Sequence, residues 1–237
     1  MALRNLRTGC IRLKTSTAAI CAITLRSSRN TFNGNNGNDT FYVRDIANHI
    51  TEFLGEGSDL AYIFADSFTL DAGSDVETII GRLTTAMALT GNELANRIDG
   101  NAGNDSIDGG AGNDLLQGHG GDDTIRGGAG NDTIYGGNGN DTVYAGLGKD
   151  WIDLGLGNDT LVYNHADFES GAEDNIYGFA ETAGSNFDHL QLQGSAANYQ
   201  FINGVNFVRV YDNATGGSAY IYGMTSASIA DQVTYFV

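Results

Sequence analysis

The 237-residue chain contains no proline, one tryptophan and only two cysteines, Cys10 and Cys21, both near its start. The body of the chain therefore cannot rest on a disulfide framework. No apolar run approaches the length of a membrane span. The G-x-S-x-G motif of α/β-hydrolases and the H-E-x-x-H motif of zinc proteases are both missing, and the four histidines show no metal-site spacing. These absences predict a protein that is not an enzyme.

Basic residues are scarce and unevenly placed. Half of the 12 Lys and Arg residues lie in residues 1–30, and from residue 31 onward 6 basic residues face 29 acidic ones, a balance of −23. So acidic a surface disfavours nucleic acid and anionic lipid as partners and suits a protein that meets divalent cations. We interpret residues 1–30 as a basic, disordered leader, because their apolar run is short and interrupted and no cleavage site follows it.

Glycine, asparagine and aspartate are abundant instead, in a nine-residue phrase repeated eight times without a gap over residues 91–162. Such a fixed period decides the fold before any local propensity does. The first and fourth positions are mostly glycine, and the eighth is always aliphatic. The sixth position is Asn96 in the first repeat and aspartate in the other seven, namely Asp105, Asp114, Asp123, Asp132, Asp141, Asp150 and Asp159.

Each position of the phrase has a physical reason. The glycines allow positive φ angles and close backbone approach, so the first half is a turn. The second half is a short strand whose aliphatic residue points inward. Two phrases then form one coil of a parallel solenoid, which stacks aspartates 18 residues apart on strands about 4.8 Å apart. Bare carboxylates at that spacing repel by roughly 1 kcal/mol in water. A hard cation with several oxygen ligands, such as Ca²⁺, removes this repulsion.

The phrase resembles the G-G-x-G-x-D-x-U-x nonapeptide of the repeats-in-toxin (RTX), or hemolysin-type, family, whose repeats form a calcium-binding parallel β-roll. The resemblance implies an all-β fold, a right-handed parallel β-roll (β-solenoid) with flanking β segments and a C-terminal β cap. A flexible linker is the alternative for so glycine-rich a segment. A linker, however, does not need an aliphatic residue at every ninth position.

The resemblance also implies a set of Ca²⁺ ligands. These are the sixth-position aspartates and backbone carbonyl groups of the glycine half. The implied pairs are Asp105 with Asp123, Asp114 with Asp132, Asp123 with Asp141, Asp132 with Asp150, and Asp141 with Asp159. The implied glycines are Gly100, Gly103, Gly109, Gly112, Gly118, Gly121, Gly127, Gly130, Gly136 and Gly139. Ala145 and Leu154 replace the first glycine in the last two repeats, so the last site is expected to be the weakest. Asn96 supplies no charge, so the first turn is expected to be a cap.

Two flanks surround the repeat block, residues 91–163. Residues 31–90 begin with one isolated phrase, which carries Asp39 in the metal position and has no adjacent repeat to stack on. The rest of this flank resembles the spacers of RTX proteins, which continue the solenoid with larger coils. Residues 164–237 are rich in aromatic residues, with a hairpin turn expected at residues 212–217. This segment is expected to cap the solenoid, and its last residues resemble a type I secretion signal.

We therefore expect a secreted, extracellular bacterial module that binds calcium ions and folds when it does so, because its aliphatic core is thin. The resemblance implies the type I secretion apparatus as a partner. One alternative is the C-terminal portion of a larger secreted hydrolase or toxin. Another is an adhesin or an ice-binding β-roll, although the third position of the phrase contains no threonine. The sequence specifies neither an oligomeric state nor the number of bound ions.

Overall fold

The structure is a computed structural model that describes residues 22–25, 31–34, 36–55, 57–164, 166–168, 173–179, 188–203, 207–223 and 232–236. In these residues the chain is an all-β solenoid, and its one helical element is a 3-10 turn at Ala196–Asn198. No helix in this part of the chain is long and apolar enough to cross a membrane. The expectation for residues 1–30 lies outside the described residues except at Ala22–Leu25, which form the strand β1.

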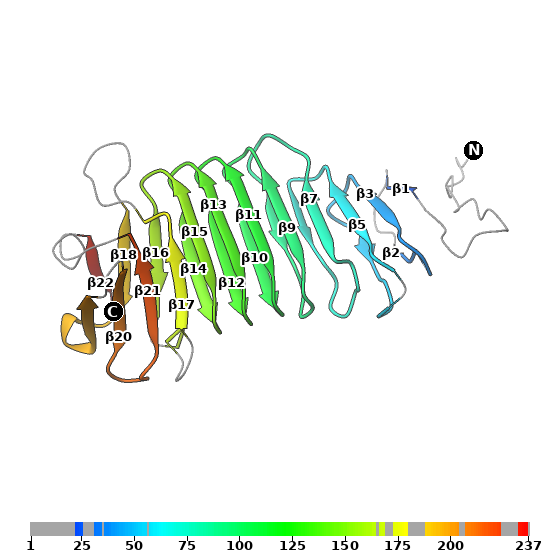
Figure 1. Ribbon diagram of the computed structural model, residues 1–237. Helices are drawn as coiled ribbons and strands as arrows, with labels where there is room; N and C mark the ends of the chain where they lie inside the picture. The colour runs from blue at the N-terminus through cyan, green and yellow to red at the C-terminus, as the bar shows by residue number, and fades with distance from the viewer. Residues whose placement is uncertain are drawn as a thin grey trace, which may run out of the picture.

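Two large sheets form the opposite walls of the solenoid (Figure 1). The first sheet has the order β1-β3-β5-β7-β9-β11-β13-β15-β17-β21-β20-β19 and the second β22-β18-β16-β14-β12-β10-β8-β6. The first comprises β1, β3 (Thr40–Val43), β5 (Leu60–Ile63), β7 (Thr78–Gly81), β9 (Arg97–Asn101), β11 (Leu115–Gly120), β13 (Thr133–Asn138), β15 (Trp151–Leu156), β17 (Glu173–Tyr177), β21 (Ser218–Tyr222), β20 (Phe207–Asp212) and β19 (Tyr199–Asn203). The second comprises β22 (Val233–Phe236), β18 (His189–Gln193), β16 (Thr160–Tyr163), β14 (Thr142–Leu147), β12 (Thr124–Ala129), β10 (Ser106–Ala111), β8 (Ala88–Thr90) and β6 (Ser67–Thr69). A short third sheet pairs β2 (Thr31–Phe32) with β4 (His49–Ile50).

Successive repeats alternate between the two walls, so each coil contains two of them. Leu116 on β11 lies beside Ile134 on β13, and Ile125 on β12 lies beside Val143 on β14, all in parallel register. The predicted parallel solenoid is therefore confirmed. The flank before the repeats continues the same walls, since β3 pairs with β5 and β5 with β7. The isolated phrase was predicted to lack a stacking partner, and this is wrong: its strand β3 packs on β5, which belongs to a phrase of similar pattern at residues 54–62, LGEGSDLAY.

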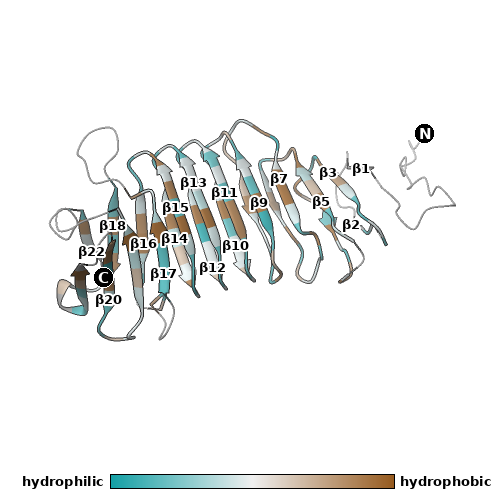
Figure 2. Cartoon of the chain, in the orientation of Figure 1, coloured by the Kyte–Doolittle hydropathy of each residue, from teal (hydrophilic) through white to brown (hydrophobic). Residues whose placement is uncertain are grey.

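The core is a single column of side chains between the walls. Every eighth-position residue of the repeats is fully buried: Ile98, Ile107, Leu116, Ile125, Ile134, Val143, Ile152 and Leu161. Phe41, Ala61 and Ile79 continue the column before the repeats, and Ile176 and Ile221 continue it after them. Figure 2 shows the resulting apolar bands, which cross neighbouring strands at matching positions. The core is long and narrow, about one large apolar residue per phrase.

The C-terminal end departs from the parallel pattern. Strand β21 pairs in parallel with β17, but β20 pairs with β21 and β19 with β20 in antiparallel fashion. The predicted hairpin turn is confirmed, because the Asp212 N–H donates to the Gly217 carbonyl at 3.1 Å. These antiparallel strands cover the end of the first sheet, as expected of a solenoid cap.

Aromatic residues at this end serve two different purposes. Tyr163 and Phe168 are buried and pack together, with ring centroids 4.7 Å apart. Other rings lie half-buried on the first sheet and stack across its strands. Trp151 lies 5.1 Å from Tyr135 and 5.3 Å from Tyr177, between centroids. Some aromatic residues near this end thus form part of the core, whereas others make a row of tilted rings that joins the cap to the repeats.

The core column predicts a stability effect. Replacing Ile134 with alanine removes buried carbons that both neighbouring coils contact. It should lower the free energy of unfolding of the calcium-loaded protein by about 2–5 kcal/mol, measured by urea denaturation. Asn138→Ala, at an exposed position of the same strand, is the control and should change it by less than about 0.5 kcal/mol. Equal effects of the two substitutions would contradict the assignment of the core.

Candidate metal centre

The seven sixth-position aspartates lie in the turns between the two walls. Each directly precedes a strand, and each is buried, with at most 3 % of its surface exposed. A carboxylate taken out of water in this way must be hydrogen-bonded, protonated or paired with a cation. The surroundings of its two oxygens therefore decide what the turn can bind.

One oxygen of each carboxylate joins two coils. Asp123 Oδ1 accepts the Asp105 backbone N–H at 2.7 Å, and Asp132 Oδ1 accepts that of Asp114 at 2.8 Å. The same bond repeats from Asp123 to Asp141, from Asp132 to Asp150 and from Asp141 to Asp159, each at 2.8 Å. The structure thus brings together all five predicted pairs, in two rows of carboxylates, one along each edge of the solenoid.

The other oxygen has no hydrogen-bond partner within the described residues. This holds for Oδ2 of Asp105, Asp114, Asp123, Asp132, Asp141, Asp150 and Asp159, all of which are buried. Seven carboxylate oxygens of one kind, at equivalent places in seven turns, are too regular to be packing defects. A buried acceptor without a donor costs about 1–3 kcal/mol, and more when it is charged. A cation bound beside Oδ2 at each turn would remove this cost.

The space beside each unpaired oxygen is lined by further oxygen. A Cβ atom placed on Gly109 would lie 2.5 Å from Asp114 Oδ2 and 2.5 Å from the Gly127 carbonyl oxygen. The same pair of groups, an Oδ2 and a carbonyl oxygen of the next coil, faces Gly118, Gly127 and Gly136. The pairing of β10 with β12 omits Gly109 and Gly127, and that of β11 with β13 omits Gly118 and Gly136. The first-position residues thus lie outside the register pairs, and the carbonyl oxygens of Gly127 and Gly136 line the space beside Oδ2.

This donor set fits Ca²⁺. No group of three or more His, Cys, Asp or Glu side chains in the described part of the chain could hold a metal ion by itself. An ion in these turns would instead take one or two carboxylates and several backbone carbonyl oxygens, which are ligands typical of calcium. Gly118, Gly127 and Gly136 are placed to supply such carbonyl groups, because each carbonyl oxygen lies near the space beside an unpaired Oδ2. The carbonyl oxygens of Gly100 and Gly109 face Gly81 and Gly91 instead, so their part as ligands stays a prediction. Gly112, Gly121, Gly130 and Gly139 have positive φ angles and, like Gly103, pack tightly on the preceding coil; their part as ligands stays a prediction.

The electrostatics agree with this geometry. Burial raises the pKa of every one of these carboxyl groups from the usual 3.8, although the backbone N–H bond opposes the shift. The pKa rises to about 6 at Asp114 and Asp141, to about 7 at Asp123, Asp132 and Asp159, and to about 8 at Asp150. At Asp150 the carboxylate of Asp174 adds to the effect of burial. Protons and cations therefore compete for the same oxygens.

Asn96 shows how a turn is closed without a cation. Its Nδ2 donates to the Val76 carbonyl at 3.0 Å, and its Oδ1 accepts the Asn92 N–H at 2.9 Å. Asn92 Nδ2 in turn donates to the carbonyl groups of Asp71 and Ser74, at 3.0 and 2.8 Å. Amide N–H groups thus satisfy oxygens at this turn. The expectation that the first turn is a cap is wrong, because β7 pairs with β9 and the coils continue before this repeat.

Sequence reasoning missed three buried aspartates that extend the rows. Asp174 Oδ1 accepts the Asp150 N–H, Asp188 Oδ1 accepts the Asp159 N–H, and Asp59 Oδ1 accepts the Asp39 N–H. Asp174 and Asp188 each begin a D-x-U-x half-phrase without the glycine half. Asp59 lies in a fuller phrase at residues 54–62, LGEGSDLAY, which departs from the pattern mainly by leucine at its first position. Asp174 differs from the repeats, because its Oδ2 accepts the Tyr163 hydroxyl at 2.8 Å. A hydroxyl proton there occupies the oxygen that a cation would need.

Asp39, the predicted ligand outside the repeat block, is buried in a different setting. Gly34, the first residue of its phrase, donates its N–H to Glu52, a second buried acid. A Cβ atom on Gly34 would meet Asp39 Oδ2 and would lie 2.7 Å from Glu52 Oε1. Two carboxylates therefore face this turn. The stacking partner of Asp39 is Asp59, 20 residues on rather than 18.

The comparisons with known proteins bear on the same turns. A family model of the RTX calcium-binding nonapeptide repeat matches residues 26–44, 90–125 and 126–161, in four copies. No curated protein matches the chain. The chain therefore carries RTX calcium-binding repeats, and the matched residues include the turns in which the unpaired carboxylate oxygens lie.

The raised pKa values predict an unusual pH dependence in calcium-free buffer. In the unfolded chain these carboxyl groups titrate near their ordinary value of about 4, whereas in the folded chain they hold protons up to about pH 6–8. Between these two ranges, from about pH 4 to about pH 8, the folded state binds more protons than the unfolded state. Its stability is therefore greatest at low pH and falls as the pH rises from about 4 to about 8.

Acidification from pH 8 to pH 5 without calcium should therefore increase the β signal in far-UV circular dichroism. With calcium present, the same acidification should weaken ion binding, because protons compete for the ligands. A calcium-free β signal that is unchanged, or smaller, at pH 5 would contradict the assigned burial of these groups.

The Asn96 turn predicts a gain of function. Asn96→Asp removes the amide donor and places a carboxylate where the other repeats have one. It should add about one bound calcium ion per chain, measured by isothermal titration calorimetry, and destabilise the calcium-free fold. Asn104→Asp, at a turn position whose side chain only accepts the exposed N–H of Asp122, is the matched control and should add none. An unchanged stoichiometry for Asn96→Asp would show that the turn cannot accept an ion.

Proposed function

We propose that this protein binds calcium ions in the turns of its repeat block, and that its role is ion binding rather than catalysis. The observation that carries the proposal is the repeated unpaired Oδ2 of the seven buried aspartates. The family match names the same ion for the same repeats. Carboxylate and carbonyl oxygens without nitrogen or sulfur ligands favour Ca²⁺ over Zn²⁺ or copper.

Calcium binding and folding are coupled in this proposal. The core contributes about one buried aliphatic side chain per nine residues, while each phrase also buries a carboxylate. Without a cation the folded state must leave those charges unpaired or protonate them, and either costs free energy at neutral pH. The unfolded chain has no preformed site, so the free energy of ion binding acts as free energy of folding.

The same coupling supports an extracellular location. Extracellular calcium modules typically have dissociation constants of about 10⁻⁴–10⁻³ M, far weaker than cytosolic calcium buffers. Sites of that affinity stay empty inside a cell and fill outside it. We propose that the chain is exported by a type I secretion apparatus while its repeats are unfolded, and that they fold in the medium. The −23 balance from residue 31 onward strengthens the attraction for divalent cations.

A pair of neighbouring aspartates tests the site. Asp123→Asn keeps the size of the side chain and its accepted hydrogen bond but removes the charge on the unpaired oxygen. It should lower the calcium affinity about tenfold or more at the affected turns, because even outer-shell partners of a metal are worth 10–100-fold. Asp122→Asn makes the same change at the exposed residue just before it and should have little effect.

The measurement is a calorimetric calcium titration of the two variants and the parent at constant pH. If both variants bind as the parent does, Asp123 is not a ligand and the proposal for this turn is wrong. If both weaken equally, the effect is general electrostatics and again not coordination.

Trp151 offers a separate readout of folding. Its ring lies between those of Tyr135 and Tyr177 on the first sheet, so it should report the assembly of the coils around it. Adding calcium to chelator-treated protein at neutral pH should change the tryptophan emission and the far-UV β signal at the same calcium concentration. A complete β signal in chelator, or tryptophan and β transitions at different concentrations, would contradict coupled folding.

A further inference from the structure

Two residues of the repeat block break the backbone rule that the others follow. The second position of the phrase has a positive φ angle in the coils from β9 to β15, and glycine fills it at Gly110, Gly128, Gly137, Gly146 and Gly155. Asn101, with φ 100°, and His119, with φ 74°, are the only residues other than glycine with a positive φ in the described part of the chain. Side chains kept in such a conformation point to a role beyond the fold.

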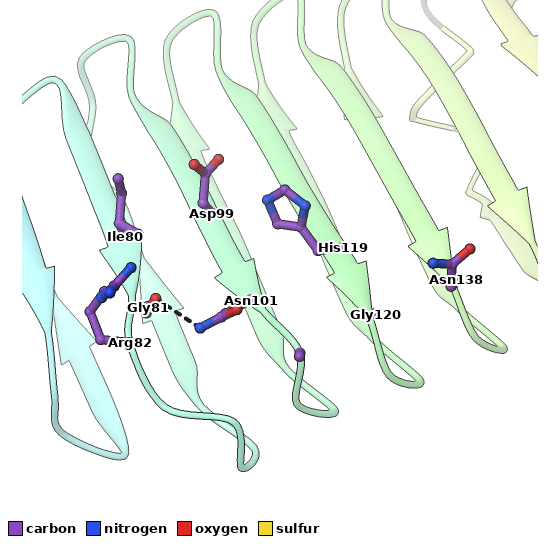
Figure 3. Close-up of a pocket in the computed structure, with 9 residues that line it drawn as sticks. Ile80, Gly81, Arg82, Asp99, Asn101, His119, Gly120 and Asn138 are labelled. Atoms are coloured by element: carbon purple, nitrogen blue, oxygen red, sulfur yellow. Dashed lines mark hydrogen bonds between the residues drawn. The ribbon is translucent and has the colours of Figure 1, made fainter.

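Both side chains line one hollow on the outer face of the first sheet. The hollow has a volume of about 490 Å³ and also involves Arg82, Asp99, Asn138 and the apolar Ile80. Figure 3 shows these side chains on four successive coils, with Asn101 between Arg82 and His119. The volume falls within the range of small-molecule sites, about 300–1,000 Å³. The carboxylate rows of the turns contribute no side chain to it.

The hollow is lined by both an acidic residue, Asp99, and a basic residue, Arg82, together with neutral amide side chains. Asp99 is 8 % exposed; its Oδ2 accepts from Arg97 Nη2 at 3.0 Å, while its buried Oδ1 has no partner in the described residues. Asn101 Nδ2 donates to the Leu83 carbonyl at 3.3 Å, which turns its amide toward that backbone. Arg82 is exposed, with its guanidinium 5.5 Å from the Tyr62 ring centroid. His119 and Asn138 are exposed as well.

This combination selects against a strongly charged ligand. An anion would meet Asp99 and the negative charge of the whole chain, and a cation would meet Arg82. A neutral ligand with many hydroxyl groups suits this lining, because each hydroxyl can donate to the amide oxygen of Asn101 or Asn138 and accept from a guanidinium or imidazole N–H. Ile80 offers an apolar patch for the C–H face of such a ligand. We propose that the hollow binds a neutral sugar residue of a glycan.

The repetitive fold gives this site a rigid base. Hydroxyl groups of a sugar ring would lie across strands whose spacing is fixed at about 4.8 Å by backbone hydrogen bonds. The hollow needs a folded roll but no particular calcium ion. Glycan binding and calcium binding can therefore be tested separately in the same protein.

The experiment uses the full chain in saturating calcium on an array of neutral and acidic glycans, with affinities then measured for any glycan bound. His119→Gly is a variant that should fold well, since glycine stands at this position in neighbouring coils. Arg82→Gln removes the cation of the hollow. Arg126→Gln makes the same charge change on the second sheet, where Arg126 lies over Tyr144, and is the control.

The expected result is binding of at least one neutral glycan, weakened tenfold or more by His119→Gly and by Arg82→Gln and unchanged by Arg126→Gln. The β signal and the calcium titration of the three variants should match those of the parent. Three outcomes would overturn the proposal: no glycan bound above the blank, binding confined to acidic glycans, or binding that survives both hollow substitutions.

Discussion

The unpaired oxygen of the sixth-position aspartate is the constraint on which the structure depends. Its partner oxygen is committed to a backbone N–H of the neighbouring coil, as in Asp123 and Asp105. This bond fixes the carboxylate in the turn and aims Oδ2 into a space beside backbone carbonyl groups. The hydrogen bond to Oδ1 therefore fixes the position of the carboxylate. Oδ2, which has no hydrogen-bond partner, faces the space that a cation would occupy. The same side chain therefore contributes both to the stacking of the coils and to the candidate ion site.

The glycines follow from the same constraint. A side chain at the first position would occupy the space beside Oδ2, as the contacts of a Cβ atom on Gly109 show. Ala145 and Leu154 hold this position in the last two repeats, and both are fully buried. They enlarge the core near the cap, so apolar packing increases as the roll approaches its C-terminal end.

The architecture of the repeat block could be predicted from the sequence, because the repeat is regular. Within the repeats every residue type is dictated by its position, so the core column, the coil of two phrases and the stacked pairs such as Asp114 with Asp132 could all be predicted. Outside them the coil length varies. Asp174 and Asp188 were missed because only half of the phrase marks them, and Asp59 because its phrase has leucine at the first position and the small Ala61 at the eighth. Three-dimensional stacking identifies such residues, since each accepts the N–H of an aspartate one coil earlier. The hollow at His119 could not be predicted from the sequence, because its lining residues come from several coils and share no motif.

The two ends of the carboxylate rows show what else can take the place of a cation. At the first repeat, the amides of Asn92 and Asn96 donate to backbone carbonyl groups. At the last coil of the first sheet, the Tyr163 hydroxyl donates to Asp174 Oδ2, and the buried tyrosine keeps its proton because its pKa is raised well above the usual value by burial and by Asp174. Neutral donors thus take the place of a cation where the run of repeats begins and ends.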